Sequence, residues 1–580
     1  MRYIKLIIFL IGFCAFTNVW AQLSTNEKPV SFGREAELCV SQRSDSPTVT
    51  VPRLTNNQLN RVEARLNDPE EPTVAGYGIK VDWNLNNSGT WYNLPNGDKL
   101  WRLNISCPEG RYILLYYDKF WLPDEGELYL YSVDSTQVLG AFTSRNNKGD
   151  NVHLRRFATG LIRGKDAVLE YYQPNGVDAD AIISICNVVY GGGNFGFNKS
   201  DNTLVNINCD EGYYWRGEQK AVARIMLREV EREDTTLVYV KPGTGSLIST
   251  SNPRGEPYFL TAYHCLPEYK KAYNYGLTDS IMDDALFFWK YEMPGCERDT
   301  IEPPLYCTAG ADIVSAYDTY ADFALLRLKE DPNDLSNYIP YYLGWDNSYQ
   351  PDTARVCIHH PMLDVKKIST VDADIGMIPT SYNSDYGEPN NGDHWRVCWK
   401  STVHGNGGTQ AGSSGAPLLN ASHKVIGQLH GSCADCNLYF GPDWFGRLCK
   451  SWNNCNTNNA LKPWLDLHEQ GTGDTDSMEG TLYVSKPCIL TRNEYIYGNI
   501  LITETGQLTI TGNIESSGVC PLLVEAGGKL IIDGGKLSNV NLELKPGATL
   551  RILNGGIIET QNGFTAPVGV VVDISHGKIL

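Results

Sequence analysis

Apolar and polar residues alternate along several segments of the chain between Tyr77 and Gln173. The runs "KLWRLNISC", "RYILLYYDKFWLP", "GELYLYSVD" and "DAVLEYYQP" place apolar side chains at alternating positions, and turn-forming residues separate the runs. Such alternation is typical of strands that bury one face. We therefore expect a β-sandwich of about 100 residues in this part of the chain.

A second pattern repeats near the C-terminus. Apolar residues recur there every 20 to 22 residues, and a glycine-bearing turn introduces each of them. The two rows are Leu508, Leu530, Leu550 and Val572, and Ile510, Ile532, Ile552 and Ile574. One strand per coil, stacked coil on coil, would bury both rows in a short β-solenoid. An ordinary β-sandwich is the alternative.

Two glycine-rich stretches divide the chain. The segments "YGGGNFGFNKSDN" (190–202) and "GTGDTD" (471–476) are typical of linkers. We expect an all-β protein, because the region between these linkers also combines strands with long polar loops. The predicted parts are a signal peptide (1–21), an N-terminal pro-segment (22–76), the sandwich with its linker (77–199), a central domain (200–468) and the C-terminal β-repeat domain (469–580).

The first segment, "MRYIKLIIFLIGFCAFTNVWAQ", is typical of a secretory signal. Basic Arg2 and Lys5 precede an apolar run, and Val19 and Ala21 fit a cleavage site after Ala21. The alternative is a membrane anchor, but the run is shorter than the roughly 20 residues that a span needs. We expect no integral membrane span and a secreted protein, extracellular or periplasmic, with association to the cell surface as a further option.

Charge and cysteine content narrow the class of partner. The net charge of -18 opposes nucleic-acid binding, because phosphates would be repelled, and it favours cationic partners. Only Cys14 of the 16 cysteines precedes the predicted cleavage site, so an odd number follows it. An exported protein can form disulfides, and at least one cysteine is then left unpaired.

The stretch "TQAGSSGAPLLN" (409–420) holds a G-x-S-G motif. A serine hydroxyl needs a neighbouring base to become a nucleophile, and the oxyanion that it generates needs fixed donors. Glycines let the backbone turn so that two N–H groups point at one spot. This motif predicts Ser414 as nucleophile and the N–H groups of Gly412 and Ser414 as the oxyanion hole, although a glycine-serine loop alone is commonly just a turn.

Two other motifs give the serine its context. The run "YFLTAYHCL" delivers His264 at the end of an apolar strand, and Asp322 opens the alternating strand "DFALLRL". Each residue alone is most simply structural. Together, in the order His264, Asp322, Ser414, they predict a general base, the carboxylate that orients it and a nucleophile.

This order and its flanks resemble the chymotrypsin-fold serine proteases, and within them the bacterial lysyl endopeptidases. The similar runs are "GSLIST", "YFLTAYHC", "FFWKYEMPGC", "DFALLRL", "YYLGWD", "IHHP", "KKIS", "GSSGAP", "VIGQLHG" and "DWFGR". The resemblance covers about residues 206–468 and implies a chymotrypsin-like double β-barrel. The upstream sandwich is similar to the propeptide of this family, which makes the chain's own propeptide an expected partner.

The resemblance also implies a specificity pocket. Asp443 in "GPDWFGR" matches the aspartate that receives a lysine side chain, and a solvated loop aspartate is the alternative. His430 and Gly431 are expected in the substrate-binding region. In the family this histidine packs beside the catalytic base against a tryptophan, and counting back from Trp399 places its counterpart at Tyr386, where a tyrosine could modulate activity or pH range.

The implied substrates are proteins or peptides with Lys, or Arg, before the scissile bond. Glutamyl endopeptidases also carry a histidine at about the position of His430, so cleavage after Glu is one alternative. A surface-binding protein on a protease-like scaffold is another. We expect no cofactor. The repeat domain could contact a surface, a glycan or the secretion machinery.

The resemblance has two consequences for processing. Lys199 in the first linker is a plausible self-processing site, which would free a chain that begins at Ser200. Trypsin-like zymogens carry an aspartate just before the catalytic serine, and Ser413 stands there in this chain. An activation ion pair of that kind cannot form, so the propeptide should act by assisting folding or by blocking.

The family places a disulfide at Cys209 and Cys296. The usual partner of Cys265 is missing, because the corresponding position falls near Gly243. The CxxC pair Cys433 and Cys436 could suggest zinc or redox chemistry, but no second pair lies close by, and disulfides with Cys449 or Cys455 are the simpler reading.

The adjacent His359 and His360 look like a metal pair. Neighbouring residues on a strand point to opposite faces, however, so a structural role is expected and no metal.

Overall fold

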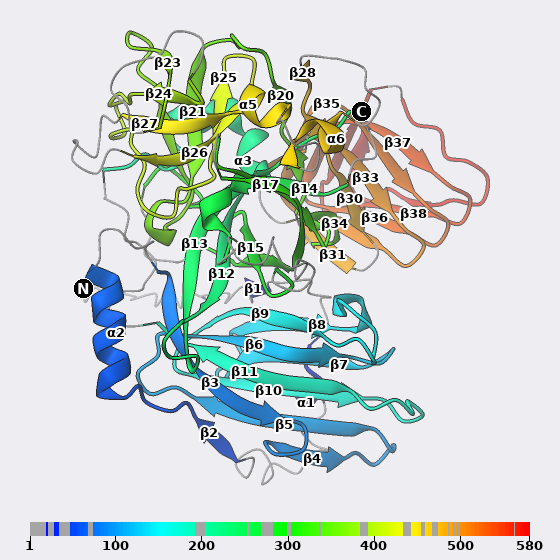
Figure 1. Ribbon diagram of the computed structural model, residues 1–580. Coiled ribbons are helices and arrows are strands. Elements are labelled where there is room, and N and C mark those ends of the chain that lie inside the picture. The colour runs from blue at the N-terminus through cyan, green and yellow to red at the C-terminus, as the bar shows by residue number, and fades with distance from the viewer. Residues whose placement is uncertain are drawn as a thin grey trace, which may run out of the picture.

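The computed structural model describes most of the chain. The described residues are 19–20, 28–33, 47–67, 74–191, 203–251, 256–267, 282–297, 303–318, 321–335, 338–382, 392–432, 442–453, 459–466, 474–484, 487–490, 493–496, 498–561 and 563–580. The fold is all-β, as predicted, and consists of a sandwich, a pair of β-barrels and a C-terminal solenoid (Figure 1). The described residues also form short helices: α1 (Val30–Gly33), α2 (Asn56–Asn67), α3 (Glu218–Ala221), α5 (Leu448–Trp452) and α6 (Lys462–Leu465).

The first sheet of the sandwich has seven strands. They are β1 (Val19–Trp20), β2 (Thr48–Thr50), β4 (Thr90–Asn93), β5 (Lys99–Ser106), β7 (Glu127–Ser132), β8 (Gln137–Phe142) and β10 (Asp166–Gln173). Their order is β1-β8-β7-β10-β5-β2, with β4 on β5. Because β2 pairs with β5, residues that precede the predicted start of the sandwich at 77 also contribute to it.

A second sheet of eleven strands runs from the sandwich into the central domain, and we call it the continuous sheet. Its strands are β3 (Gly76–Asn84), β6 (Tyr112–Trp121), β9 (Arg155–Arg163), β11 (Ile182–Val189), β12 (Val222–Val230), β13 (Leu237–Leu247), β14 (Tyr258–Ala262), β15 (Leu286–Trp289), β16 (Tyr306–Ala309), β17 (Ala311–Tyr317) and β18 (Phe323–Leu328). Strands β3, β11, β6 and β9 belong to the sandwich, and β12 to β18 form the first barrel.

The second barrel is a nine-stranded sheet. It contains β20 (Trp345–Asp346), β21 (Ala354–His359), β22 (Lys367–Thr370), β23 (Met377–Thr380), β24 (His394–Val397), β25 (Pro417–Asn420), β26 (Val425–Ser432), β27 (Asp443–Arg447) and β28 (Asp474–Thr475). A two-stranded sheet joins β19 (Tyr341–Tyr342) to β29 (Met478–Glu479). The described residues also form short 3₁₀ helices: η2 (Ser144–Asn146), η3 (Asp210–Trp215), η4 (Tyr263–Cys265), η5 (Pro332–Asp334) and η6 (Pro361–Leu363).

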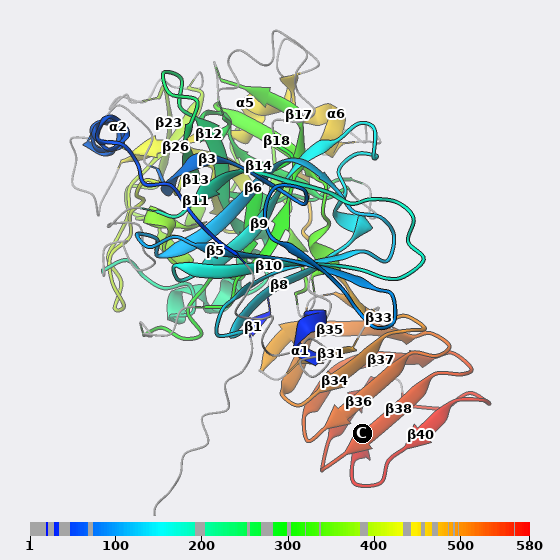
Figure 2. The same ribbon diagram turned by 90° about the horizontal axis from the view of Figure 1, so that it is seen from below.

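The C-terminal coils form two parallel sheets. One contains β31 (Pro487–Leu490), β34 (Gln507–Ile510), β36 (Lys529–Asp533), β38 (Thr549–Leu553) and β40 (Val571–Asp573); the other contains β30 (Thr481–Val484), β32 (Glu494–Ile496), β33 (Asn499–Ile502), β35 (Asn513–Val524), β37 (Lys536–Leu544), β39 (Ile557–Thr560) and β41 (Lys578–Ile579). The coils stack along one axis (Figure 2). The solenoid is confirmed, although each coil contributes a strand to both sheets rather than a single strand.

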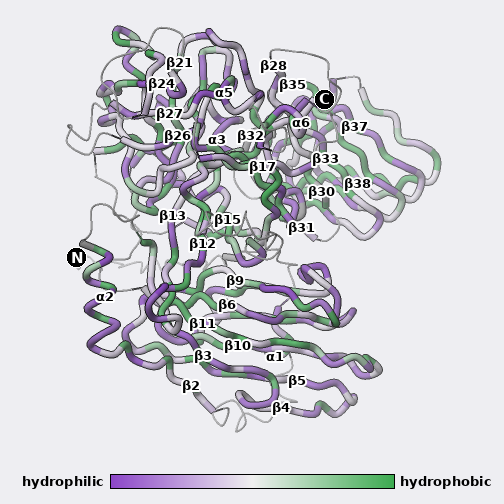
Figure 3. Tube along the Cα trace, viewed as in Figure 1, coloured by the Kyte–Doolittle hydropathy of each residue, from purple (hydrophilic) through white to green (hydrophobic). Residues whose placement is uncertain are grey.

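The predicted rows explain the solenoid core. Leu508, Leu530 and Leu550 stand in register on neighbouring coils and are fully buried. Val572 continues the row but is 36% exposed, because it lies on the last rung of β40. Apolar and polar residues alternate along these strands and along those of the sandwich (Figure 3).

Candidate active site

Strand pairing brings His264 and Asp322 together. Strand β14 ends at Ala262 and leads into η4, which carries His264, and Ala262 pairs with Phe323, the first residue of β18. Nδ1 of His264 lies 2.6 Å from Oδ2 of Asp322, and the His264 backbone N–H donates to Oδ1 at 3.0 Å. Burial opposes a charged imidazole, but the charge and hydrogen bond of the buried Asp322 outweigh it and raise the pKa of His264. The pair therefore holds the base in one orientation.

The Ser414 loop lies against the segment that follows His264. The Thr244 N–H donates to the Ser414 carbonyl at 2.8 Å, and the Cys265 thiol donates to the same oxygen at 3.6 Å. Both Ser414 and His264 are partly exposed. Among the described residues the Ser414 hydroxyl makes no hydrogen bond to His264. Such bonds are often long without substrate and tighten in the complex.

The loop leaves two backbone donors free. In the described chain no acceptor is bonded to the N–H of Gly412 or of Ser414, whereas the N–H groups of Ser413 and Gly415 donate to backbone carbonyls at 2.9 and 2.8 Å. Gly412 adopts a φ of 90°, a left-handed conformation that favours glycine. The two free donors are those that the sequence predicts for the oxyanion hole.

Ser413 is a buried structural partner of the loop. Its hydroxyl lies 2.8 Å from Nδ1 of His359, and Nε2 of His359 lies 3.0 Å from the Ser369 hydroxyl. Burial lowers the pKa of His359 to about 3, with Lys367 adding to the effect, so this imidazole is neutral. His360 bonds through Nδ1 to the carbonyl of Asp364. The two adjacent histidines thus point to different partners and do not converge on one ion.

Asp443 is a buried carboxylate without a cationic partner. It is 2% exposed at the start of β27, and its Oδ2 accepts hydrogen bonds from Nε1 of Trp399 at 2.6 Å and from the Thr409 hydroxyl at 2.7 Å. No ion pair to Asp443 occurs among the described residues. Burial raises its pKa to about 6, and the two hydrogen bonds only partly oppose this. Thr409 begins the loop that carries Ser414, so the carboxylate lies beside the oxyanion loop.

His430 packs between Tyr382 and the pair formed by His264 and Asp322. Its ring is stacked on Tyr382 with centroids 3.8 Å apart, and it also lies over His264 at 5.6 Å. Nδ1 of His430 is 2.9 Å from Nε2 of His394, and its Nε2 is 3.7 Å from Oδ2 of Asp322. Burial lowers the pKa of His430, assisted by the charge of His264, against the opposing effect of Asp322.

The predicted modulating residue Tyr386 lies outside the described residues. The tyrosine that stacks on His430 is Tyr382, four positions earlier and two residues after β23. The proposed role of Tyr386 stays a prediction. Gly431 is needed here because a Cβ atom on it would lie 2.6 Å from the Tyr382 hydroxyl oxygen.

Two groups of side chains have the composition of metal ligands. Donor atoms of His264, Asp322 and His430 all lie within 4.8 Å of one another, and so do those of Cys209, Cys296 and His404. In the first group Nδ1 of His264 already bonds Asp322. In the second group both sulfurs are in a disulfide, so no thiolate is available.

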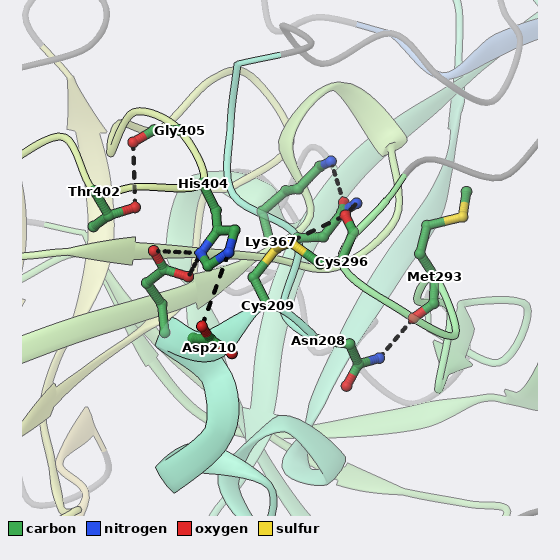
Figure 4. Close-up of a disulfide and its surroundings, with 11 residues drawn as sticks. Asn208, Cys209, Asp210, Met293, Cys296, Lys367, Thr402, His404 and Gly405 are labelled. Atoms are coloured by element: carbon green, nitrogen blue, oxygen red, sulfur yellow. Dashed lines mark hydrogen bonds and ion pairs between the residues drawn. A yellow bond between two sulfur atoms is a disulfide. The ribbon is translucent and has the colours of Figure 1, made fainter.

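The predicted disulfide between Cys209 and Cys296 is present (Figure 4). It links the segment before η3 to the loop after β15, next to His404, whose Nδ1 lies 2.9 Å from Glu211. Cys265 is buried and unpaired among the described residues, and a Cβ on Gly243 would lie 3.3 Å from its sulfur. The position of the missing partner thus faces Cys265, as the sequence indicates.

Several predicted residues lie outside the described chain. These are Ala21, Lys199, Cys433, Cys436 and Cys455, so signal cleavage, self-processing and the pairing of Cys449 stay predictions. None of the described helices has the length and apolar character needed to cross a membrane.

Sequence reasoning missed four residues of this site. Tyr382 and His394 sit in no motif, and Thr409 and Trp399 contribute only donors to Asp443. Strand β24 pairs with β27, which begins at Asp443. Trp399 lies two residues after β24, so a search for donors near this strand would have found it.

The paired barrels, with this candidate site between them, have the chymotrypsin-like fold. Residues 197–446 match a family described as lysyl endopeptidase, C-terminal domain. This part of the chain is a lysyl endopeptidase-related protease domain, and the protein is a protease. Similar solved structures include the active form of the Rv3671c protease from M. tuberculosis (16% identity, 43% of this chain and 88% of that chain, TM-score 0.25) and an HtrA-type protease with tripeptide (14%, 41% and 60%, TM-score 0.26).

Proposed function

We propose that the protein is a secreted serine endopeptidase that hydrolyses peptide bonds on the carboxyl side of lysine, with arginine as the second residue to be tested. The observation that carries the specificity is Asp443, a buried carboxylate held by two neutral donors and by no cation among the described residues. A lysine ammonium entering the pocket would regain there the partner that it loses on leaving water.

The geometry suits acyl transfer. The Ser414 hydroxyl attacks the scissile carbonyl carbon while Nε2 of His264 takes its proton, and the carbonyl π electrons move onto oxygen. The N–H groups of Gly412 and Ser414 donate to that oxyanion, because neither is bonded to another acceptor among the described residues. Asp322 holds Nδ1–H of His264 and stabilises the imidazolium.

The tetrahedral intermediate then collapses with loss of the amine. The C–N bond breaks, the imidazolium of His264 gives its proton to the leaving nitrogen, and an ester with Ser414 remains. Water attacks this ester with His264 again as base, and the acid product and the free Ser414 hydroxyl are released. No oxidant, reductant or cofactor is needed for either half.

A panel of otherwise identical peptide amides ending in Lys, Arg, Glu or Phe tests the proposal. We expect cleavage of the Lys amide, and a fall of about 10⁴-fold or more in kcat for Ser414→Ala. Labelling by a fluorophosphonate followed by peptide mapping gives an independent readout. It should modify Ser414 in the wild type and in the control Ser413→Ala, but not in Ser414→Ala. Exclusive cleavage after Glu would overturn the role of Asp443, and labelling without turnover of any amide would favour a binding scaffold.

Export is part of the proposal and rests on the N-terminal sequence and on the Cys209–Cys296 disulfide, which is typical of oxidising compartments. Mass spectrometry of the protein recovered from the medium or periplasm would give its N-terminus. A start at Gln22 supports signal cleavage after Ala21, and a start at Ser200 supports processing after Lys199. A full-length chain retained in the cytoplasm would contradict export.

A further inference from the structure

The sandwich and the protease domain share one hydrogen-bonded sheet. Strand β3 pairs antiparallel with β13, in the register Leu237 with Ile79 through Val240 with Gly76. The pairing is extended at both ends, because the Ala75 N–H donates to the Val240 carbonyl at 2.5 Å and the Lys80 N–H donates to the Thr236 carbonyl at 2.7 Å. In Figure 1 these long strands cross from the sandwich into the first barrel. Two strands that are far apart in the chain thus pair within one sheet.

The two parts also share one apolar core. A single cluster of buried side chains joins Ile79, Tyr116 and Phe157 of the sandwich to residues of the protease domain. The contributions of the protease domain include Leu237, Tyr239, Val240, Phe288, Tyr291 and Met293. Separation of the two parts would expose this continuous apolar surface to water, which is unfavourable roughly in proportion to its area.

Charged side chains cross the same boundary in nearly buried positions. The guanidinium of Arg155 donates two hydrogen bonds to Asp283, at 2.6 and 3.0 Å, and the Asp283 carboxylate is fully buried. Nζ of Lys148 lies 2.8 Å from Glu330, and both of these side chains are only 3% exposed. Loss of one member of such a pair is costly because its partner stays desolvated.

Helix α2 adds a third contact, upstream of β3. Arg61 and Arg65 reach Glu233 and Glu229 at 2.6 and 3.2 Å, and Nε2 of Gln58 donates to Asp234 at 3.1 Å. The acceptors all lie on the end of β12 and the turn before β13. Side chains between residues 58 and 155 therefore contact one edge of the first barrel.

The shared core extends to the support of the oxyanion loop. The buried Arg224 lies against the rings of Phe288 and Tyr291, with Cζ 4.7 and 4.0 Å from their centroids, and donates to the Leu363 carbonyl at 2.7 Å. The next residue back, Met362, donates its N–H to the carbonyl of Ala411, directly before Gly412. The apolar core that the sandwich covers is thus connected, through Arg224 and the Met362–Leu363 segment, to the loop that carries the two free N–H donors.

We propose that the N-terminal region before the 192–202 linker, which includes the whole sandwich, is a non-covalent subunit of the protease rather than a detachable propeptide. After hydrolysis of the 192–202 linker it stays paired on β13, and the two fragments remain one complex. The partner that the edge of β13 accepts is β3 of the same chain. This inference does not depend on which residue the protease cleaves after.

The test uses the full chain in a Ser414→Ala background, so that it is independent of catalysis. Residues 193–198 are replaced by the recognition sequence of a highly specific viral protease, and the chain is cut there. Size-exclusion chromatography with light scattering at micromolar concentration should show one species with the mass of the uncut chain. Two separate peaks, each with the mass of one fragment, would overturn the proposal.

A charge-reversal variant, Arg65→Glu with Lys148→Glu and Arg155→Glu, should weaken fragment association by at least about tenfold after the cut. The matched control is Arg53→Glu, since Arg53 pairs with Glu109 within the sandwich and is exposed. Equal association of the variant and the control would contradict the role of these contacts. Should the triple variant fail to fold, hydrogen exchange of residues 236–247 before and after the cut decides: we expect unchanged protection, and fast exchange after the cut would overturn the proposal.

Discussion

Nε1 of Trp399 donates a 2.6 Å hydrogen bond to Oδ2 of Asp443, and the Thr409 hydroxyl donates to the same oxygen at 2.7 Å. The carboxylate is thus fixed in place by neutral groups, which leave its charge uncompensated. A buried carboxylate held in this way is costly to the free protein, and under the proposed function it would favour a cationic substrate side chain. Replacement of Asp443 is therefore expected to raise the stability of the protein and to lower its activity on lysine substrates.

Asp443→Asn should stabilise the protein at neutral and alkaline pH. A buried acid with a pKa of about 6, against an ordinary value of 3.8, binds its proton more tightly folded than unfolded. Stability therefore falls as pH rises from about 4 to about 6, and the ionised group costs up to about 3 kcal/mol above that range. We expect a higher Tm for Asp443→Asn than for wild type at pH 8, and no such gain at pH 4, by calorimetry. The surface substitution Asp374→Asn should leave Tm unchanged at both values, and a lower Tm of Asp443→Asn at pH 8 would contradict a strained carboxylate.

Thr409→Val should shift the pH dependence of lysine cleavage. Loss of one of the two donors to Asp443 removes a hydrogen bond that favours the charged form, so the pKa of Asp443 rises further above about 6. The acidic limb of kcat/KM for a Lys amide should move to higher pH, with a loss of about tenfold near pH 6. Thr402→Val, at a partly buried turn between β24 and β25 whose hydroxyl donates to the Gly405 carbonyl, is the control. An unchanged pH profile would mean that Asp443 does not bind the substrate cation.

Gly412→Ala should lower kcat by about 10²-fold with little change in KM, because a strained or shifted Gly412 N–H can no longer donate to the oxyanion. Its φ of 90° disfavours alanine, and the new Cβ would lie 3.1 Å from the His360 carbonyl. Gly176→Ala is the matched control, since Gly176 has a φ of 94° and nothing lies within 4 Å of a Cβ there. Both variants pay a similar backbone strain, and only Gly412→Ala should lose activity; equal kcat values would exclude this loop as the oxyanion hole.

Tyr382→Leu should reduce activity on the acid side only. The stacked Tyr382 ring helps to bury His430, and burial is the main cause of the lowered pKa of His430. With the ring removed, His430 becomes protonated at higher pH, and its charge disfavours the imidazolium of His264 beside it. We expect kcat/KM to fall several-fold below about pH 6.5, the ordinary histidine pKa, and to match wild type at pH 8.5. An NMR titration of His430 should show the raised pKa.

Tyr213→Leu, an exposed aromatic residue on η3, is the control for that experiment. A wild-type profile for Tyr382→Leu, together with an unchanged His430 titration, would contradict the shielding role of the tyrosine.

The sequence predicts best those features that short segments determine. Short sequence motifs indicate the positions of His264, Asp322 and Gly412. Each of these residues lies next to the end of a strand or in a tight loop. The rows through Leu508 and Ile510 are equally local, because each coil repeats the same spacing. The relative placement of these segments comes from β14–β18 pairing, which the family resemblance supplies rather than the pattern itself.

The features that escaped prediction depend on contacts between distant segments. The pairing of β3 with β13 joins two strands of similar alternating pattern, and nothing in either strand specifies the other as its partner. Tyr382 was missed for a related reason, since its stacking on His430 joins two segments that are far apart in the chain. His394, buried beside His430, sits in a strand whose pattern gives no sign of a ring-to-ring hydrogen bond.

Cleavage-site mapping by mass spectrometry, on an unstructured peptide library of mixed sequence, tests the central claim most directly. Wild type should cut almost entirely after Lys, with Arg as the minor site, and Asp443→Asn should lose this preference at pH 8 while Ser414 still reacts with a fluorophosphonate. Retention of the lysine preference in Asp443→Asn, or cleavage after Glu in the wild type, would contradict the account.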